Sequence, residues 1–132
     1  MACNAHYSAA DGIPALRLDS DQRTEIVRRF YERAPFPGYP PHDSLSSLRA
    51  RAERSDFARR LDQAIAGDAR IVEIGCGTGQ MSLYLARADR VVIAVDLTRA
   101  SLQLGSAAAR RYGVRNVAFV ESGLPQPGFR RA

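Results

Sequence analysis

A short apolar run that breaks into a glycine-rich loop most constrains what this 132-residue chain can fold into. Residues 70–80 read R-I-V-E-I-G-C-G-T-G-Q, with glycines at Gly75, Gly77 and Gly79. A second apolar run follows and ends on the carboxylate of Asp96. Glycines let a ligand approach the backbone, and an acid after the next strand can accept hydrogen bonds from ribose hydroxyls. The pattern therefore predicts a parallel α/β sheet that holds an adenosine-containing ligand.

Strands and helices alternate around this loop. Strands are predicted at 71–74, 91–95 and 117–120. One helix is expected to start near Thr78, with Met81, Leu85 and Ala86 turned inward, and another to run from a Thr98 cap to about Tyr112 and Gly113. Such alternation predicts right-handed crossovers and a parallel sheet. The expected fold class is α/β, a partial Rossmann-like sheet of about three strands with helices on both faces, because the run at 91–95 is typical of a strand buried on both sides.

The residues before the sheet are predicted to form helices joined by a proline-rich connector. Asp19 and Gln22 suggest a capping pair for a helix to about Arg33, with an apolar stripe at Ile26, Val27, Phe30 and Tyr31. The connector at 34–41, A-P-F-P-G-Y-P-P, excludes helix and central strand. It is interpreted either as a lid over a cofactor or substrate, or as a linker anchored by its aromatic residues.

A second helical region is predicted at 44–66. Apolar stripes are expected at Leu45, Leu48 and Ala52, and then at Phe57, Leu61 and Ile65. A break is expected at Ser55 and a C-cap at Gly67. The chain thus divides into a loose N-terminus (1–18), a helical cap region (19–67) and an α/β half-domain (68–132).

Composition narrows the function classes. The chain is 45% hydrophobic and 25% charged, as in ordinary globular proteins. It has neither an apolar run of about 18 residues nor a signal-peptide pattern at its start, which predicts no membrane partner and a cytoplasmic location. All 19 basic residues are arginine and the net charge is +5. This indicates either nucleic-acid binding or a biased composition, and the wide spacing of the arginines favours the latter. Cys3 and Cys76 lie far apart and predict neither a metal site nor a disulfide.

The glycine loop matches neither of two common phosphate-binding motifs. A Walker A loop needs a lysine, and the chain has none. A nicotinamide dinucleotide fingerprint needs its third glycine where Gln80 stands.

The segment instead resembles motif I of class I S-adenosylmethionine-dependent methyltransferases, an apolar strand with an acid followed by G-x-G-x-G. The aromatic–proline lead-in from Phe30 to Tyr39 adds to the resemblance, which covers roughly Gln22 to Leu124. It implies S-adenosyl-L-methionine as cofactor, with the acid at motif I orienting its methionine end and Asp96 binding its ribose. The cofactor-binding residues implied are Glu73, Gly75, Cys76, Gly77, Gly79, Asp96 and Leu97.

The chain departs from that family pattern in two ways. The complete family fold has seven strands, whereas three are predicted here, so an N-terminal portion truncated after the third strand is expected. The family's adenine-contacting acid aligns near Gly123, with Glu121 as a substitute. No catalytic base and no methyl acceptor can be named. The alternative function is a non-catalytic cofactor-binding or partner-binding module, completed by another chain or a second copy at the exposed strand edge.

Overall fold

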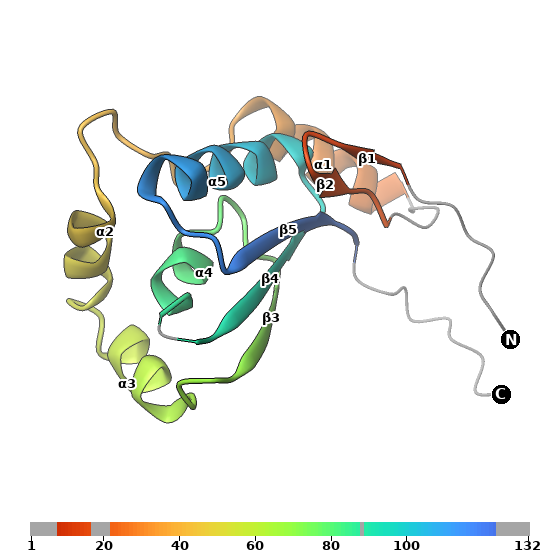
Figure 1. Cartoon of the computed structure of the whole chain (residues 1–132). Helices are drawn as coiled ribbons and strands as arrows, with labels where there is room; N and C mark the ends of the chain where they lie inside the picture. Colours follow the sequence, from red (N-terminus) through yellow and green to blue (C-terminus); the bar gives the residue numbers. More distant parts are fainter. Residues whose placement is uncertain (1–7, 17–21, 88, 124–132) are drawn as a thin grey trace, which may run out of the picture.

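The computed structural model describes residues 8–16, 22–87 and 89–123. Within these ranges the chain forms short strands and helices, which Figure 1 labels. In chain order they are β1 (Ala9–Ala10), β2 (Ile13–Pro14), α1 (Gln22–Arg33), α2 (Leu45–Ala52), α3 (Asp56–Ala64), β3 (Arg70–Ile74), α4 (Gln80–Leu85), β4 (Val91–Asp96), α5 (Arg99–Tyr112) and β5 (Val117–Glu121).

The main sheet is parallel and has the order β3-β4-β5. Its register pairs Arg70 with Val91 at one end and Asp96 with Glu121 at the other. Helices α4 and α5 are the crossovers between successive strands (Figure 1). The predicted three-stranded Rossmann-like sheet is therefore confirmed, and each predicted strand is found within one residue of its expected ends.

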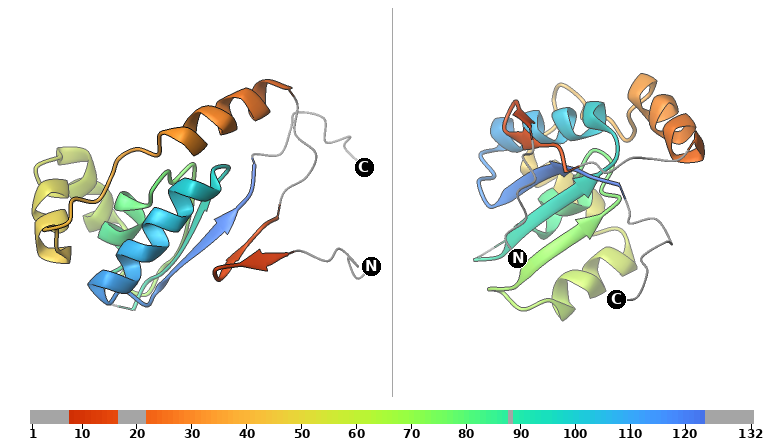
Figure 2. Two further views of the ribbon diagram at one scale, coloured as in Figure 1. Left: turned by 90° about the horizontal axis from the view of Figure 1, so that it is seen from above. Right: turned by 90° about the vertical axis from the view of Figure 1, so that its right-hand side faces the viewer.

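The predicted coverage of both sheet faces is wrong for the described residues. On the face that carries α4 and α5, Val92 and Ala94 are completely buried. On the opposite face Val72 and Ile74 are each 60% exposed and Val91 is 47% exposed. The right-hand view of Figure 2 looks onto this open face. Two right-handed crossovers that advance in the same direction along a sheet place both helices on the same side, so only one face is covered.

The core lies between the covered sheet face and the helices. Leu83, Leu102 and Val92 are fully buried, and Tyr84 is 1% exposed. Helices α2 and α3 contribute buried side chains to the same cluster, although Phe57, placed on the second predicted apolar stripe, is 68% exposed. The α3 face that packs is the one carrying Ala58 and the partly buried Leu61 and Ile65.

Arg90 joins α3 to the start of β4. Its guanidinium forms an ion pair with Asp62 at 2.5 Å and donates to the carbonyls of Asp62, Ile65, Ala66 and Leu85. The side chain is buried, so these partners replace the water that a charged group requires. The guanidinium thus satisfies carbonyls that the end of α3 leaves free.

The N-terminus is more ordered than the sequence predicted. Of the segment 1–18 expected to be loose, residues 8–16 form a hairpin of β1 and β2 that turns at Asp11 and Gly12, both with positive φ. Ile13 is 1% exposed, and the Leu16 N–H donates to the Glu121 carbonyl of β5 at 2.7 Å. An Asp-Gly pair is a strong hairpin signal, so this feature was readable and was missed. The proposed cap Asp19 lies outside the described residues.

The helix boundaries were mostly predicted. The break between α2 and α3 is confirmed, and Ser44 and Ser55 cap the two helices through their side chains. The Gly67 C-cap is wrong because α3 ends earlier, at an extended Ile65. Thr98 is the N-cap of α5 as predicted, but its side chain makes no capping hydrogen bond. No helix within the described ranges is both long and apolar enough to cross a bilayer.

Candidate functional site

The glycine loop is fastened to the carboxyl end of β4. The N–H groups of Gly75 and Cys76 both donate to the Val95 carbonyl, at 2.8 and 3.0 Å. The three loop glycines have positive φ values: 75° at Gly75, 57° at Gly77 and 82° at Gly79. Residues other than glycine rarely adopt this backbone conformation. The loop therefore needs glycine at these positions in order to turn from strand into helix.

Gly79 lies beneath the loop, where α4 begins. A Cβ at this position would stand 2.7 Å from Cε1 of Phe119 on β5. Gly105 of α5 packs against the same spot, where an added Cβ would meet the Thr78 carbonyl oxygen at 2.4 Å. These two glycines let the loop, α5 and β5 come into close contact, which holds the loop against the sheet.

Asp96 lies at the carboxyl end of β4 with its carboxylate toward the loop. Its Oδ2 accepts from the Gly77 N–H and its Oδ1 from the Thr98 N–H, each at 2.8 Å. These backbone donors fix the orientation of the carboxylate. Because a carboxylate offers about four acceptor positions, two remain for a ligand hydroxyl pair.

Glu73 points into the covered face of the sheet. Its carboxylate accepts a hydrogen bond from the Ser82 hydroxyl of α4. Burial raises the pKa of Glu73, the Ser82 hydrogen bond opposes that rise, and the nearby charge of Asp96 adds to it. The structure thus places the motif I acid behind the loop, between β3 and α4.

Two other predicted residues complete the surroundings of the loop. Cys76 is buried, and burial raises the pKa of its thiol, with the carboxylates of Asp96 and Glu73 adding to the effect. A protonated, buried thiol is a poor nucleophile. Leu97 is half-buried, and its Cδ1 would lie 3.5 Å from a Cβ added to Gly123. The ends of β4 and β5 therefore meet beside the loop.

The proline-rich connector lies directly on the loop. The Thr78 hydroxyl donates to the Pro37 carbonyl at 2.6 Å, and the Tyr39 hydroxyl donates to the Thr78 carbonyl at 2.7 Å. The Gln80 amide reaches the Gly38 carbonyl at 2.9 Å. This favours the anchored-linker interpretation for Tyr39, whereas the lid interpretation is untested.

The sequence did not predict that the side chains of Thr78 and Gln80 bind the proline-rich connector. The only sequence signal for this role is that both residues are polar and lie at the start of a helix. For Phe36, the sequence does not decide between a lid over the site and an anchor for the linker. The Phe36 side chain is 76% exposed, beside a connector that is otherwise anchored.

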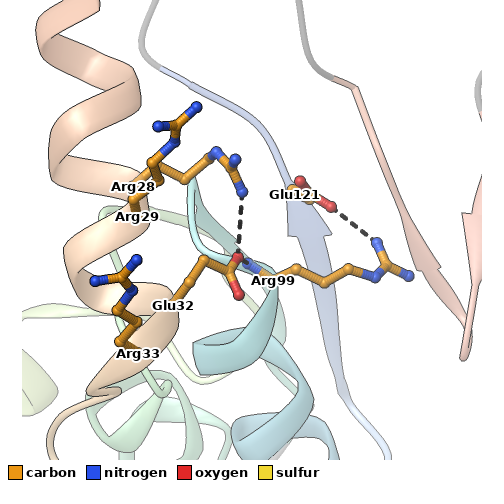
Figure 3. A pocket seen from close by; sticks show the side chains of 6 residues that line it. All are labelled: Arg28, Arg29, Glu32, Arg33, Arg99 and Glu121. Atoms are coloured by element: carbon orange, nitrogen blue, oxygen red, sulfur yellow. Dashed lines mark hydrogen bonds and ion pairs between the residues drawn. The ribbon is translucent and has the colours of Figure 1, made fainter.

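The end of β5 carries an ion pair. Glu121 is 5% exposed and binds the Arg99 guanidinium at 2.8 Å (Figure 3). Arg99 also donates to the Ala10 carbonyl of the hairpin at 2.6 Å. Glu121, considered above as a substitute adenine contact, is thus engaged with α5.

Comparison with known sequences agrees with this geometry. Residues 71–131 match the family described as Methyltransferase domain. A 23S rRNA (uracil(1939)-C(5))-methyltransferase from Pseudomonas putida is 36% identical over 72 residues, covering 51% of this chain and 16% of that protein. Its counterpart from Marinomonas posidonica is 37% identical over 96 residues, covering 63% of this chain and 22% of that protein. Residues 71–131 thus match a methyltransferase domain, in agreement with the resemblance to class I S-adenosylmethionine-dependent methyltransferases. The chain spans less than a quarter of the length of these curated relatives.

Solved structures show the same methyltransferase fold. Geranyl diphosphate C-methyltransferase from Streptomyces coelicolor superimposes with a TM-score of 0.59 at 18% identity, covering 83% of this chain and 50% of that one. The [4+2]-cyclase SpnF superimposes with a TM-score of 0.56 at 22% identity, covering 89% of this chain and 48% of that one. At these identities the likeness establishes the fold alone.

Proposed function

We propose that the chain binds S-adenosyl-L-methionine at the glycine loop and takes part in methyl transfer to an acceptor. The observation that carries the proposal is the position of Asp96, held by two backbone N–H groups at the edge of the loop. A carboxylate fixed there can accept hydrogen bonds from both hydroxyls of a ribose.

The residues present fit such a cofactor. Gly75 is exposed, and a Cβ added to it would meet nothing within 4 Å, so the loop backbone borders open space. Leu97 supplies an apolar surface next to Asp96 that suits a purine ring. The loop offers no lysine or arginine for a diphosphate, and S-adenosylmethionine carries none.

The bound cofactor would supply an electrophilic methyl group on a sulfonium. The chain contributes binding and orientation: Asp96 fixes the ribose, and the loop glycines allow close approach. Alignment of an acceptor with the methyl group is the main contribution an enzyme makes to a direct displacement. Glu73 acts on the site through its contact with Ser82, which ties α4 to β3 behind the loop.

Calorimetric titration with S-adenosylhomocysteine tests the proposal, with NAD as the competing dinucleotide. We expect saturable binding of the former alone. Asp96→Ala should weaken it by at least about tenfold, because one charge-assisted hydrogen bond contributes about 1.5–3 kcal/mol. The matched control is Asp89→Ala, which removes an exposed carboxylate just before the opposite end of β4. Equal affinity in the two variants, with both folded by circular dichroism, would contradict the assignment of Asp96.

The acceptor is a separate question. Both curated relatives named above are methyltransferases of 23S rRNA, so ribosomal RNA is one acceptor to test. Transfer of a radiolabelled methyl group to RNA, compared with transfer to a small-molecule fraction, distinguishes the two classes.

A second candidate function is a cofactor-binding module that another chain completes. The apolar residues on the open sheet face favour it, because large exposed apolar patches usually mark an interaction surface. Cofactor binding without turnover by the isolated chain would support this candidate. Turnover by a chain shown by light scattering to be monomeric would contradict it.

A further inference from the structure

Helix α1 sits on the protein with its charged side inward. Glu25 and Arg28 form an ion pair at 2.5 Å, with both side chains only about a quarter exposed or less (27% and 21%). The Glu32 carboxylate accepts from the Arg99 N–H of α5 at 2.9 Å. Residues 25, 28 and 32 share one side of a helix, so this side is the one that faces α5.

The apolar residues of α1 face away from the protein. Ile26 is 63% exposed, Val27 is 51% exposed and Phe30 is 64% exposed. No residue of α1 is buried. This inverts the usual orientation of an amphipathic helix and leaves an apolar stripe in solvent.

Two hollows lie on either side of one ridge of this helix. The outer hollow has a volume of about 470 Å³ and is mainly apolar, being lined by Ile26, Arg29, Phe30, Arg33 and Ala34. The inner hollow has a volume of about 430 Å³ and is charged, being lined by Arg28, Arg29, Glu32, Arg33, Arg99 and Glu121 (Figure 3). Arg29 and Arg33 line both, so they form the ridge.

The charge of the inner hollow favours an anion. Its lining has four guanidinium groups against two carboxylates. Arg28 is engaged with Glu25 and Glu32, and Arg99 with Glu121. The Arg29 side chain is 71% exposed and lies 3.7 Å from Glu25, and Arg33 is also exposed. These two ridge arginines are therefore the ones placed to bind phosphate or carboxylate oxygens.

We propose that α1 binds a single-chain amphiphilic anion. Its acidic head lies between Arg29 and Arg33 at the inner hollow, and its alkyl chain crosses the ridge onto Ile26 and Phe30. A flat bilayer touches only the outer side of α1, whereas the two hollows lie on opposite sides of the ridge. One flexible molecule reaches both. This site goes beyond the proposed cofactor function and does not depend on it.

Octyl phosphate, kept below its micelle concentration, is the probe, titrated calorimetrically into the full 132-residue chain. The comparison ligands are inorganic phosphate and neutral octyl glucoside. We expect octyl phosphate to bind at least tenfold tighter than either. The double variant Arg29→Gln/Arg33→Gln and the single variant Phe30→Ser should each weaken binding at least tenfold.

Matched controls come from α3 and its approach, away from the ridge. The Arg54→Gln/Arg60→Gln variant removes two exposed arginines, and Phe57→Ser removes an aromatic ring that is 68% exposed. Both should retain affinity within twofold. Circular dichroism checks that every variant is folded, which the exposure of these positions favours.

Three outcomes would overturn the proposal. The first is octyl phosphate affinity no higher than that of either comparison ligand. The second is binding to anionic phosphatidylglycerol vesicles but not to monomeric octyl phosphate, which assigns the stripe to a bilayer. The third is a concentration-dependent dimer that Phe30→Ser abolishes and octyl phosphate does not affect, which assigns it to a second copy of the chain.

Discussion

Replacing Gly105 by alanine should destabilise the protein and weaken its cofactor site together. The new Cβ would stand 2.4 Å from the Thr78 carbonyl oxygen and 2.6 Å from Cε1 of Phe119. The first contact is about 1 Å short of ordinary packing distance, and its partner is backbone that cannot rotate away. Overpacking of this kind costs about 1–3 kcal/mol, while alanine in a helix gains back about 1 kcal/mol. We expect a net loss of up to about 2 kcal/mol.

Urea unfolding measures the first effect and S-adenosylhomocysteine titration the second. Affinity should fall because α5 can relieve the contact only by displacing Thr78, which belongs to the glycine loop. Gly67→Ala is the control, since a Cβ there meets nothing within 4 Å and its φ is not positive. An unfolding free energy for Gly105→Ala equal to or above that of the parent, with unchanged affinity, would refute the close-contact reasoning.

Three further changes test other contacts. Arg90→Met should lower the unfolding free energy by about 3 kcal/mol in urea titrations, because it removes the nearer cation from Asp62, leaving Arg87 at 3.8 Å, and removes the donor from several carbonyls; a loss below about 1 kcal/mol would show that water replaces the guanidinium. The pKa of Asp43 is held well below its usual value, chiefly by the paired hydrogen bonds from Arg51, so its contribution to stability is complete above about pH 5 and is lost as the pH falls further. The unfolding free-energy difference between the parent and Asp43→Asn should therefore shrink between pH 6 and pH 3, and a constant difference would exclude the ion pair as its source. Tyr39→Phe should cost about 1 kcal/mol and weaken S-adenosylhomocysteine binding, because the Thr78 carbonyl loses its donor; affinity equal to that of the parent would separate the connector from the site.

Local features of the chain were predictable because they depend on neighbours in sequence. The strands follow from short apolar runs, and the break at Ser55 follows from a capping residue inside a helical stretch. The hairpin at Asp11 and Gly12 was equally local and was missed, because the surrounding residues are few and show no period. Its attachment to β5 was not readable, since it joins opposite ends of the chain.

The orientation of α1 shows where a periodic pattern fails. The stripe containing Ile26 and Phe30 identified the helix correctly. It did not reveal that the stripe faces solvent, because the inward side is chosen by Glu32, whose partner Arg99 lies in a distant helix. An apolar stripe shows that a helix has two different faces. Which face is turned inward depends on the residues of other segments that each face contacts.

The sequence by itself determined a parallel α/β sheet, a loop that requires glycine, and an acid at the end of the following strand. These depend on backbone sterics and on periods of about two and 3.6 residues, which act over a few positions. The tertiary structure alone decided that both helices cover one sheet face, that Glu73 turns to Ser82, and that Gly79 and Gly105 meet at Phe119. Those outcomes depend on close packing between segments distant in sequence, and no local pattern encodes the distance between them.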